Sequence, residues 1–148
     1  MTTYTTIERC HKETDEVIET LSKEALDTPM NQLEKWMDSF IYLESPHFDQ
    51  LQMDCLTLEK DDVFLTYTAL FGLHLPKDQQ EFLKYYIETH TNPTLAKHAI
   101  LYSDKDRMFD VNFTLDALEG FNAQLTIQET IDLLSAFMAD FQFAREKQ

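Results

Sequence analysis

Hydrophobic and polar positions alternate most regularly between residues 97 and 116. In the second half of this stretch every other residue is apolar, which is the period of a β-strand with one buried face. A shorter alternating run precedes it, and the polar segment SDKDR at 103–107 separates the two. The pattern predicts a hairpin whose second strand buries Phe109, Val111, Phe113 and Leu115.

A second alternating region lies between residues 51 and 70. LQMDCLTL (51–58) and VFLTYTAL (63–70) flank the charged turn EKDD, and the second run is rich in the β-branched and aromatic residues that favour strands. Phe64 and Leu70 fall on the face opposite Val63, which gives this strand more apolar surface than a one-sided sheet requires. We expect a second hairpin here, to which LHL (73–75) could add a short third strand.

Four other segments repeat their apolar residues every three to four positions, as amphipathic helices do. The first has a thin apolar stripe among many acidic residues. The second begins at Pro29, which is favoured at the first helical position, and the last begins with the capping-box spacing Thr126-x-x-Glu129. The predicted helices cover residues 3–26, 28–45, 78–91 and 126–145.

The order of these elements predicts an α+β fold: helix, helix, strand, strand, an optional short strand, helix, strand, strand, helix. We expect an antiparallel sheet of two hairpins, with four or five strands in all, packed against helices. A length of 148 residues suits one domain. Within it, residues 1–28 would form an acidic N-terminal helix and residues 29–148 the α+β core.

The charge balance narrows the range of partners. Twelve Lys and Arg face 27 Asp and Glu, which leaves a net charge of −15. Such a surface repels nucleic acids and anionic membranes and attracts basic proteins. No apolar run reaches the length of a membrane helix, and MTTYTTIERC lacks the apolar core of a signal peptide. Cys10 and Cys55 show no disulfide or zinc pattern, so we expect a cytoplasmic protein with reduced thiols.

Two patterns resemble metal sites, and neither is complete. Asp104 and Asp106 have the spacing of EF-hand ligands, but the Gly and the final Glu of a calcium loop are missing from this stretch. Glu8-x-x-His11 has the spacing used by di-iron helical bundles, which need a second such motif. The other Glu-x-x-His, at residues 44–47, is interrupted by Pro46. We expect no metal and no cofactor, although a metal-dependent enzyme using Glu8 and His11 stays an alternative.

Catalytic signatures are likewise missing from the sequence. His74, His90 and His98 are scattered, two isolated glycines cannot form a phosphate loop, and no serine or cysteine lies in a nucleophile motif. A site assembled from residues distant in sequence would leave no such signature. We therefore predict no catalytic residue and a protein that is not an enzyme.

From residue 30 to 148 the chain resembles the type III secretion chaperone-like superfamily, including the YbjN-type proteins. The parallel lies in YIETHTN, in AILYSDKDRMFDVNFTLD as the late hairpin, and in TIQETIDLLSAFMADFQFA as the closing helix. The resemblance implies a homodimer that holds an extended segment of a client protein. It would place client contacts on the outward faces of strands 51–58 and 63–70 and the dimer contact on the helix after Asp78. The implied surface residues are Phe64, Tyr67, Leu70, Phe82, Leu83, Tyr86 and Ile87, all of which also fit an ordinary core.

Two functional hypotheses follow. The first is a non-enzymatic protein-binding module of chaperone or adaptor type, which the resemblance implies to be a homodimer. The second is an acidic inhibitor or immunity protein whose carboxylates cover a basic site on a toxin or a nucleic-acid-binding protein. Clustering of carboxylates on one face, for example along residues 8–24, would favour the second hypothesis.

Overall fold

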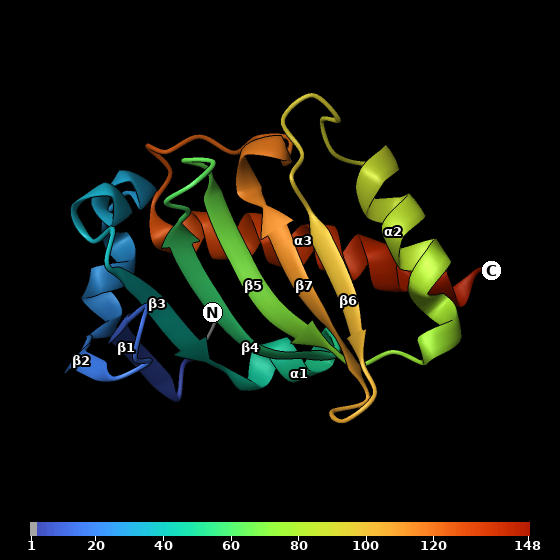
Figure 1. Cartoon of the computed structure of the whole chain (residues 1–148), viewed down its shortest axis with the longest axis horizontal. Helices are drawn as coiled ribbons and strands as arrows, with labels where there is room; N and C mark the ends of the chain where they lie inside the picture. The colour runs from blue at the N-terminus through green and yellow to red at the C-terminus, as the bar shows by residue number, and fades with distance from the viewer. Residues whose placement is uncertain (1–2) are drawn as a thin grey trace.

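The computed structural model describes residues 3–148, which build one antiparallel sheet of seven strands (Figure 1). The strands lie in the order β2-β1-β3-β4-β5-β7-β6. Three hairpins (β1–β2, β4–β5 and β6–β7) are joined through β3 and through the pairing of β5 with β7. The strands are β1 Thr6–His11, β2 Val17–Thr20, β3 Ser39–Glu44, β4 Met53–Lys60, β5 Tyr67–Leu73, β6 Ala99–Ser103 and β7 Met108–Thr114.

Helix α3 (Ile127–Glu146) covers one face of the sheet and crosses behind the central strands in Figure 1. Its predicted capping box is confirmed. The Glu129 N–H donates to the Thr126 hydroxyl (3.0 Å), and the Thr126 N–H donates to the Glu129 carboxylate (2.9 Å). The helix buries one stripe of apolar residues, namely Ile127, Ile131, Leu134, Met138 and Phe141.

The other helical segments are short and connect the strands. Helix α2 (Gln80–Thr89) lies beside β6, and α1 (Pro46–Gln50) links β3 to β4. The remaining turns are 3-10 helices: η1 Lys23–Asp27, η2 Met30–Lys35, η3 Lys77–Gln79 and η4 Leu115–Ala117.

Alternate residues of the central strands form the core against α3. On β5 these are Ala69, Phe71 and Leu73, all buried. The strand register places each of them between apolar residues of β4 and β7, so every cross-strand row on this face is apolar. The rows are Leu58-Ala69-Phe113, Leu56-Phe71-Val111 and Met53-Leu73-Phe109.

The helix predicted over residues 3–26 is wrong. This segment forms the β1–β2 hairpin followed by η1, and β1 pairs with β3 along its whole length. Val17 and Ile18, two residues of the proposed apolar stripe, are exposed on β2. A helix with so thin a stripe gains little from packing, whereas the β-branched residues of this segment favour extended backbone and β3 supplies hydrogen-bond partners.

The helix predicted over residues 28–45 is also wrong. The chain forms η2 and then β3, in which buried Ile41 and Leu43 flank the less buried Tyr42. Leu33 and Ile41 belong to two different elements, although their spacing fits one helix. Residues four positions apart lie on the same side of both a helix and a strand. The apolar residues of 28–45 therefore fit a helical pattern, which concealed the alternation of residues 39–44.

The predicted hairpins are present with shifted boundaries: β4 is Met53–Lys60 instead of 51–58, and the start of β5 moves furthest. β5 begins at Tyr67 instead of residue 63, because residues 61–66 form the connecting loop. In the β6–β7 hairpin, Asp104 and Asp106 lie in the turn, as the alternation predicted. The fold class of four or five strands after two helices is nevertheless wrong. The described chain is predominantly β, with a seven-stranded sheet and a C-terminal helix.

Candidate functional site

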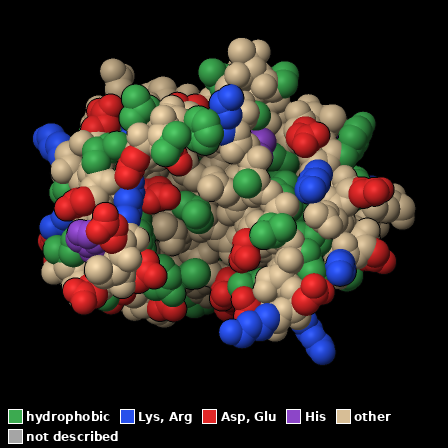
Figure 2. Space-filling model, in the orientation of Figure 1, with side chains coloured by type: hydrophobic (Ala, Val, Ile, Leu, Met, Phe, Trp, Pro, Cys, Tyr) green, Lys and Arg blue, Asp and Glu red, His purple; other side chains and the backbone are tan. Residues whose placement is uncertain are grey.

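The face of the sheet opposite α3 is the most distinctive surface of the molecule. Figure 2 shows this face, which is hollowed at its centre and has acidic side chains around much of its margin. The hollow, of about 420 Å³, lies over β4, β5, β7 and β6. It is lined by Asp54, Cys55, Thr57, Leu70, Phe71, Gly72, Ala99, Leu101, Met108, Asp110, Val111 and Asn112, and we call it the open-face hollow.

The floor of the open-face hollow is apolar where Gly72 of β5 carries no side chain and Met108 lies across it. A Cβ built at Gly72 would lie 2.6 Å from the Met108 sulfur, so the Met108 side chain lies directly across this glycine. Leu70 is half-buried nearby on the same strand. Leu101 of the edge strand β6 is 70% exposed, so it offers a large apolar contact at the rim.

Two carboxylates flank this apolar floor. Asp110 of β7 lies opposite Gly72 of β5 and opposite Leu101 of β6 in the strand register. Asp54 of β4 lies on the other side of Gly72. In the described part of the chain, no Lys or Arg forms a salt bridge with either of them. The hollow therefore combines apolar surface with uncompensated negative charge.

Cys55 contributes a thiol to the wall of the hollow, beside Tyr42 of β3. Burial raises the pKa of the Cys55 thiol. The pKa of Tyr42 is raised mainly by burial and, as the next largest cause, by its hydrogen bond to Glu44. The Tyr42 hydroxyl donates to the Glu44 carboxylate (2.9 Å). Both groups therefore stay protonated at neutral pH, and the thiol lacks the character of an activated nucleophile.

The loop between β4 and β5 carries the largest run of exposed apolar side chains. Val63 is 80% exposed, Phe64 58% and Leu65 59%. Hydrophobic side chains gather along the upper margin in Figure 2, where this loop lies in Figure 1. The Lys97 ammonium lies 5.6 Å from the centre of the Phe64 ring. We call residues 63–65 the apolar tip.

The surface residues implied by the sequence fall into four places. Phe64 lies on the apolar tip, and Leu70 lines the open-face hollow. Tyr67 is buried, with its ring 5.7 Å from that of Phe121. On α2, Leu83, Tyr86 and Ile87 are buried and Phe82 is partly buried, and Phe82 and Tyr86 pack on Phe141 of α3. This side of α2 therefore packs inside its own chain.

Sequence reasoning missed the residues on the β6 and β7 side of the hollow. The alternation identified Phe109 and Val111 as buried, and the residues between them face the other side of the sheet. Asp110 and Leu101 could therefore have been placed on a common face. The contact of Met108 with Gly72 depends on the pairing of β5 with β7, for which the sequence carries no local signal.

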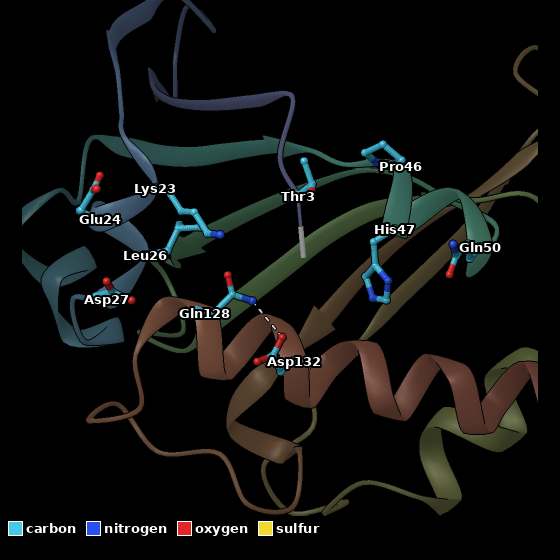
Figure 3. A pocket seen from close by; sticks show the side chains of 10 residues that line it. All are labelled: Thr3, Lys23, Glu24, Leu26, Asp27, Pro46, His47, Gln50, Gln128 and Asp132. Carbon is cyan, nitrogen blue, oxygen red and sulfur yellow. Dashed lines mark hydrogen bonds between the residues drawn. The ribbon is translucent and has the colours of Figure 1, made fainter. Parts of the chain in front are cut away.

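A larger crevice of about 1030 Å³ opens on the helix side of the sheet (Figure 3). His47 of α1 points into it from one side, and Gln128 and Asp132 of α3 from the other. Gln128 is already engaged, since its amide donates to Asp132 (2.9 Å) and its oxygen accepts from the Tyr4 hydroxyl (2.8 Å). The crevice lies at a junction between elements and is lined mainly by polar side chains, with Leu26 and Pro46 as its apolar lining residues.

Metal binding finds no support in residues 3–148, where no three His, Cys, Asp or Glu side chains group around a common point. Glu8 and His11 lie on β1, and residues three apart on a strand point to opposite faces. The di-iron alternative therefore loses the helix that it required. Within the same residues, no helix is both long and apolar enough to cross a membrane.

No protein-family model, curated protein or solved structure matches this chain.

Proposed function

We propose that this protein is a cytoplasmic protein-binding module of chaperone or adaptor type that holds an extended segment of a partner protein in the open-face hollow. The observation that carries the proposal is a sheet face with an apolar, acid-flanked hollow opposite the face that α3 covers. The unpaired thiols of Cys10 and Cys55 suit a reducing compartment.

The shape of the hollow suits an extended segment. It spans four strands, which at about 4.8 Å between neighbours is roughly 14 Å. An extended chain covers that distance with about four residues, and alternate side chains point to the same side. Two apolar side chains of the partner would therefore reach the floor formed by Leu70, Leu101 and Met108.

The negative charge of the hollow favours basic residues between the two apolar residues of the partner segment. Asp54 and Asp110 would pair with Lys or Arg of the partner segment, and the net charge of −15 attracts a basic partner at long range. The preferred partner segment therefore alternates apolar and basic residues.

Fluorescence polarisation with synthetic peptides tests this proposal. A labelled peptide that alternates Leu and Arg should bind, and Leu101→Asp should weaken its binding at least tenfold. Phe143→Asp is the matched control, because Phe143 is 62% exposed on α3, the helix that packs on the opposite face of the sheet. Both variants replace an exposed leucine or phenylalanine by the same charge, so both should stay folded.

Two outcomes would contradict the proposal. Equal binding of the alternating peptide to the wild type and to Leu101→Asp would remove the hollow as the site. Equal binding of an apolar-free polyarginine peptide, lost at high salt, would instead favour an acidic inhibitor that covers a basic surface.

A further inference from the structure

His98, the residue directly before β6, is bonded in a way that only its neutral ring allows. Its Nδ1 accepts the backbone N–H of Thr114 at the end of β7 (3.0 Å). Its Nε2 lies 3.0 Å from the Thr91 hydroxyl, which donates its own proton to the Ile87 carbonyl of α2 (2.7 Å) and therefore accepts from the ring. A second ring proton, on Nδ1, would face the Thr114 N–H and break this bond.

The elements packed around His98 offer nothing that stabilises a positive charge. The His98 ring lies 4.8 Å from that of Phe113 on β7, and Phe113 is fully buried against Phe137 of α3. The side chains that β7 and the end of α2 direct at the ring are therefore aromatic or hydroxyl groups. A protonated ring in this position loses the solvation that it has in water.

Two ionisable groups close to His98 in sequence are directed elsewhere. The His90 Nδ1 lies 2.8 Å from the Tyr86 carbonyl oxygen, and the Lys97 ammonium lies 5.6 Å from the centre of the Phe64 ring. Burial alone lowers the pKa of His98, from 6.5 to about 4, and no charged group of residues 3–148 contributes to that change.

The connection between α2 and β6, residues 93–98, is lightly attached to the rest of the chain. It forms the loop that rises between α2 and β6 in Figure 1, and three of its N–H groups bond to Asn92 directly before it. Among the described residues, its hydrogen bonds to other parts of the chain come from Lys97 and His98 alone. The Lys97 N–H donates to the Thr114 hydroxyl (2.9 Å), and His98 makes the two bonds given above.

We propose that the α2–β6 connection is an acid-sensitive latch, which protonation of His98 releases from Thr114 while the sheet stays paired. Release brings the charged ring into water without breaking a strand pairing, because β6 pairs with β7 only from Ala99 onward. The open latch uncovers Phe113 and withdraws Lys97 from the apolar tip. It does not depend on what the open-face hollow binds.

The effect of pH has a definite sign and size. In the closed latch the pKa of His98 is about 4, and in the open latch the ring meets water and regains a pKa near 6.5. Between these values only the open latch binds the proton, so opening becomes more favourable as the pH falls. The full shift would raise the opening equilibrium constant by about thirtyfold between pH 7.5 and pH 5.0, and the partial exposure of the ring reduces this to about tenfold.

Amide hydrogen exchange of the full chain, resolved by residue with NMR at pH 7.5 and pH 5.0, tests the latch. After correction for the intrinsic exchange rate at each pH, the Thr114 N–H should lose about tenfold of its protection at pH 5.0. The Val111 N–H, in the middle of β7, should keep its protection. In His98→Asn the side-chain oxygen can still accept the Thr114 N–H but does not titrate, so the loss should disappear. The exposed His74→Asn is the matched control and should behave like the wild type.

Four results overturn the inference. Unchanged protection of Thr114 in the wild type shows that acid does not open the connection, and a parallel loss at Val111 shows that the sheet opens with it. An NMR titration that gives the folded His98 ring a pKa near 6.5 removes the cause of opening. The same loss at Thr114 in His98→Asn assigns the pH dependence to other groups. The first three are measured on the wild type, so they hold even where a variant fails to fold.

Discussion

His98 makes the stability of the fold depend on pH in a predictable direction. Its Nδ1 accepts the Thr114 backbone N–H (3.0 Å), so the neutral ring carries its proton on Nε2. That Nε2 lies 3.0 Å from the Thr91 hydroxyl, which in turn donates to the Ile87 carbonyl (2.7 Å). The neutral imidazole thereby ties β7 to the end of α2. Protonation would abolish the Nδ1 acceptor and place a charge in a largely buried site.

Burial lowers the pKa of His98 from 6.5 to about 4. Between these values the unfolded chain binds a proton that the folded chain does not, so the contribution of His98 is complete above pH 6.5 and is lost as the pH falls toward 4. A shift of one pKa unit corresponds to about 1.4 kcal/mol, which gives about 2 kcal/mol by pH 5 for the full shift. Since part of the ring is exposed, we expect about 1–2 kcal/mol.

Urea denaturation at pH 7.5 and pH 5.0 measures this loss. In His98→Asn the side-chain oxygen can still accept the Thr114 N–H, but the residue does not titrate. The wild type should lose about 1–2 kcal/mol more than His98→Asn over this interval, whereas the exposed His74→Asn should behave like the wild type. The carboxylates affect all three proteins alike. Equal losses in the wild type and in His98→Asn would refute the reasoning.

Three further changes test the packing. Gly72→Ala should cost about 1–3 kcal/mol, because the Met108 thioether must move and the Asp54 Cβ lies 3.2 Å from the added carbon, and the displaced Met108 should weaken peptide binding in the fluorescence assay. Thr126→Ala removes the hydroxyl that caps α3 and should lower the free energy of unfolding by about 1 kcal/mol in urea. Phe141→Ala should cost about 3–5 kcal/mol in the same measurement, because Phe141 is fully buried against α2; a loss near 1 kcal/mol would show that α3 is not the cover of the core.

The parts of the fold that the sequence predicts are those with a local cause. The capping box at Thr126 and the alternation around Val111 each arise within a few residues, and both are present in the structure. The helix predictions for residues 3–26 and 28–45 are wrong because the strands that form there depend on pairing with distant strands. β1 pairs with β3, and β3 pairs with β4. Short edge strands with exposed Val17 and Ile18 carry no period-two signal of burial.

The functional surface is harder to predict for the same reason. Val63, Phe64 and Leu65 resemble a strand in sequence, and only the hydrogen bonds of Asp61 turn them into an exposed tip. The open-face hollow draws its residues from four strands, and its depth at Gly72 depends on a pairing between β5 and β7 that spans about forty residues of chain. A contact of this kind has no spacing rule.

The acidic surface and the open-face hollow are best understood together. An exposed apolar face favours non-specific association, and a net charge of −15 opposes association with other acidic molecules. A basic partner segment would overcome that opposition, since its Lys or Arg side chains would pair with Asp54 and Asp110 while its apolar side chains cover Leu101. Raising the salt concentration should therefore weaken binding of the peptide that alternates Leu and Arg without abolishing it, because screening removes the charge attraction and leaves the apolar contacts.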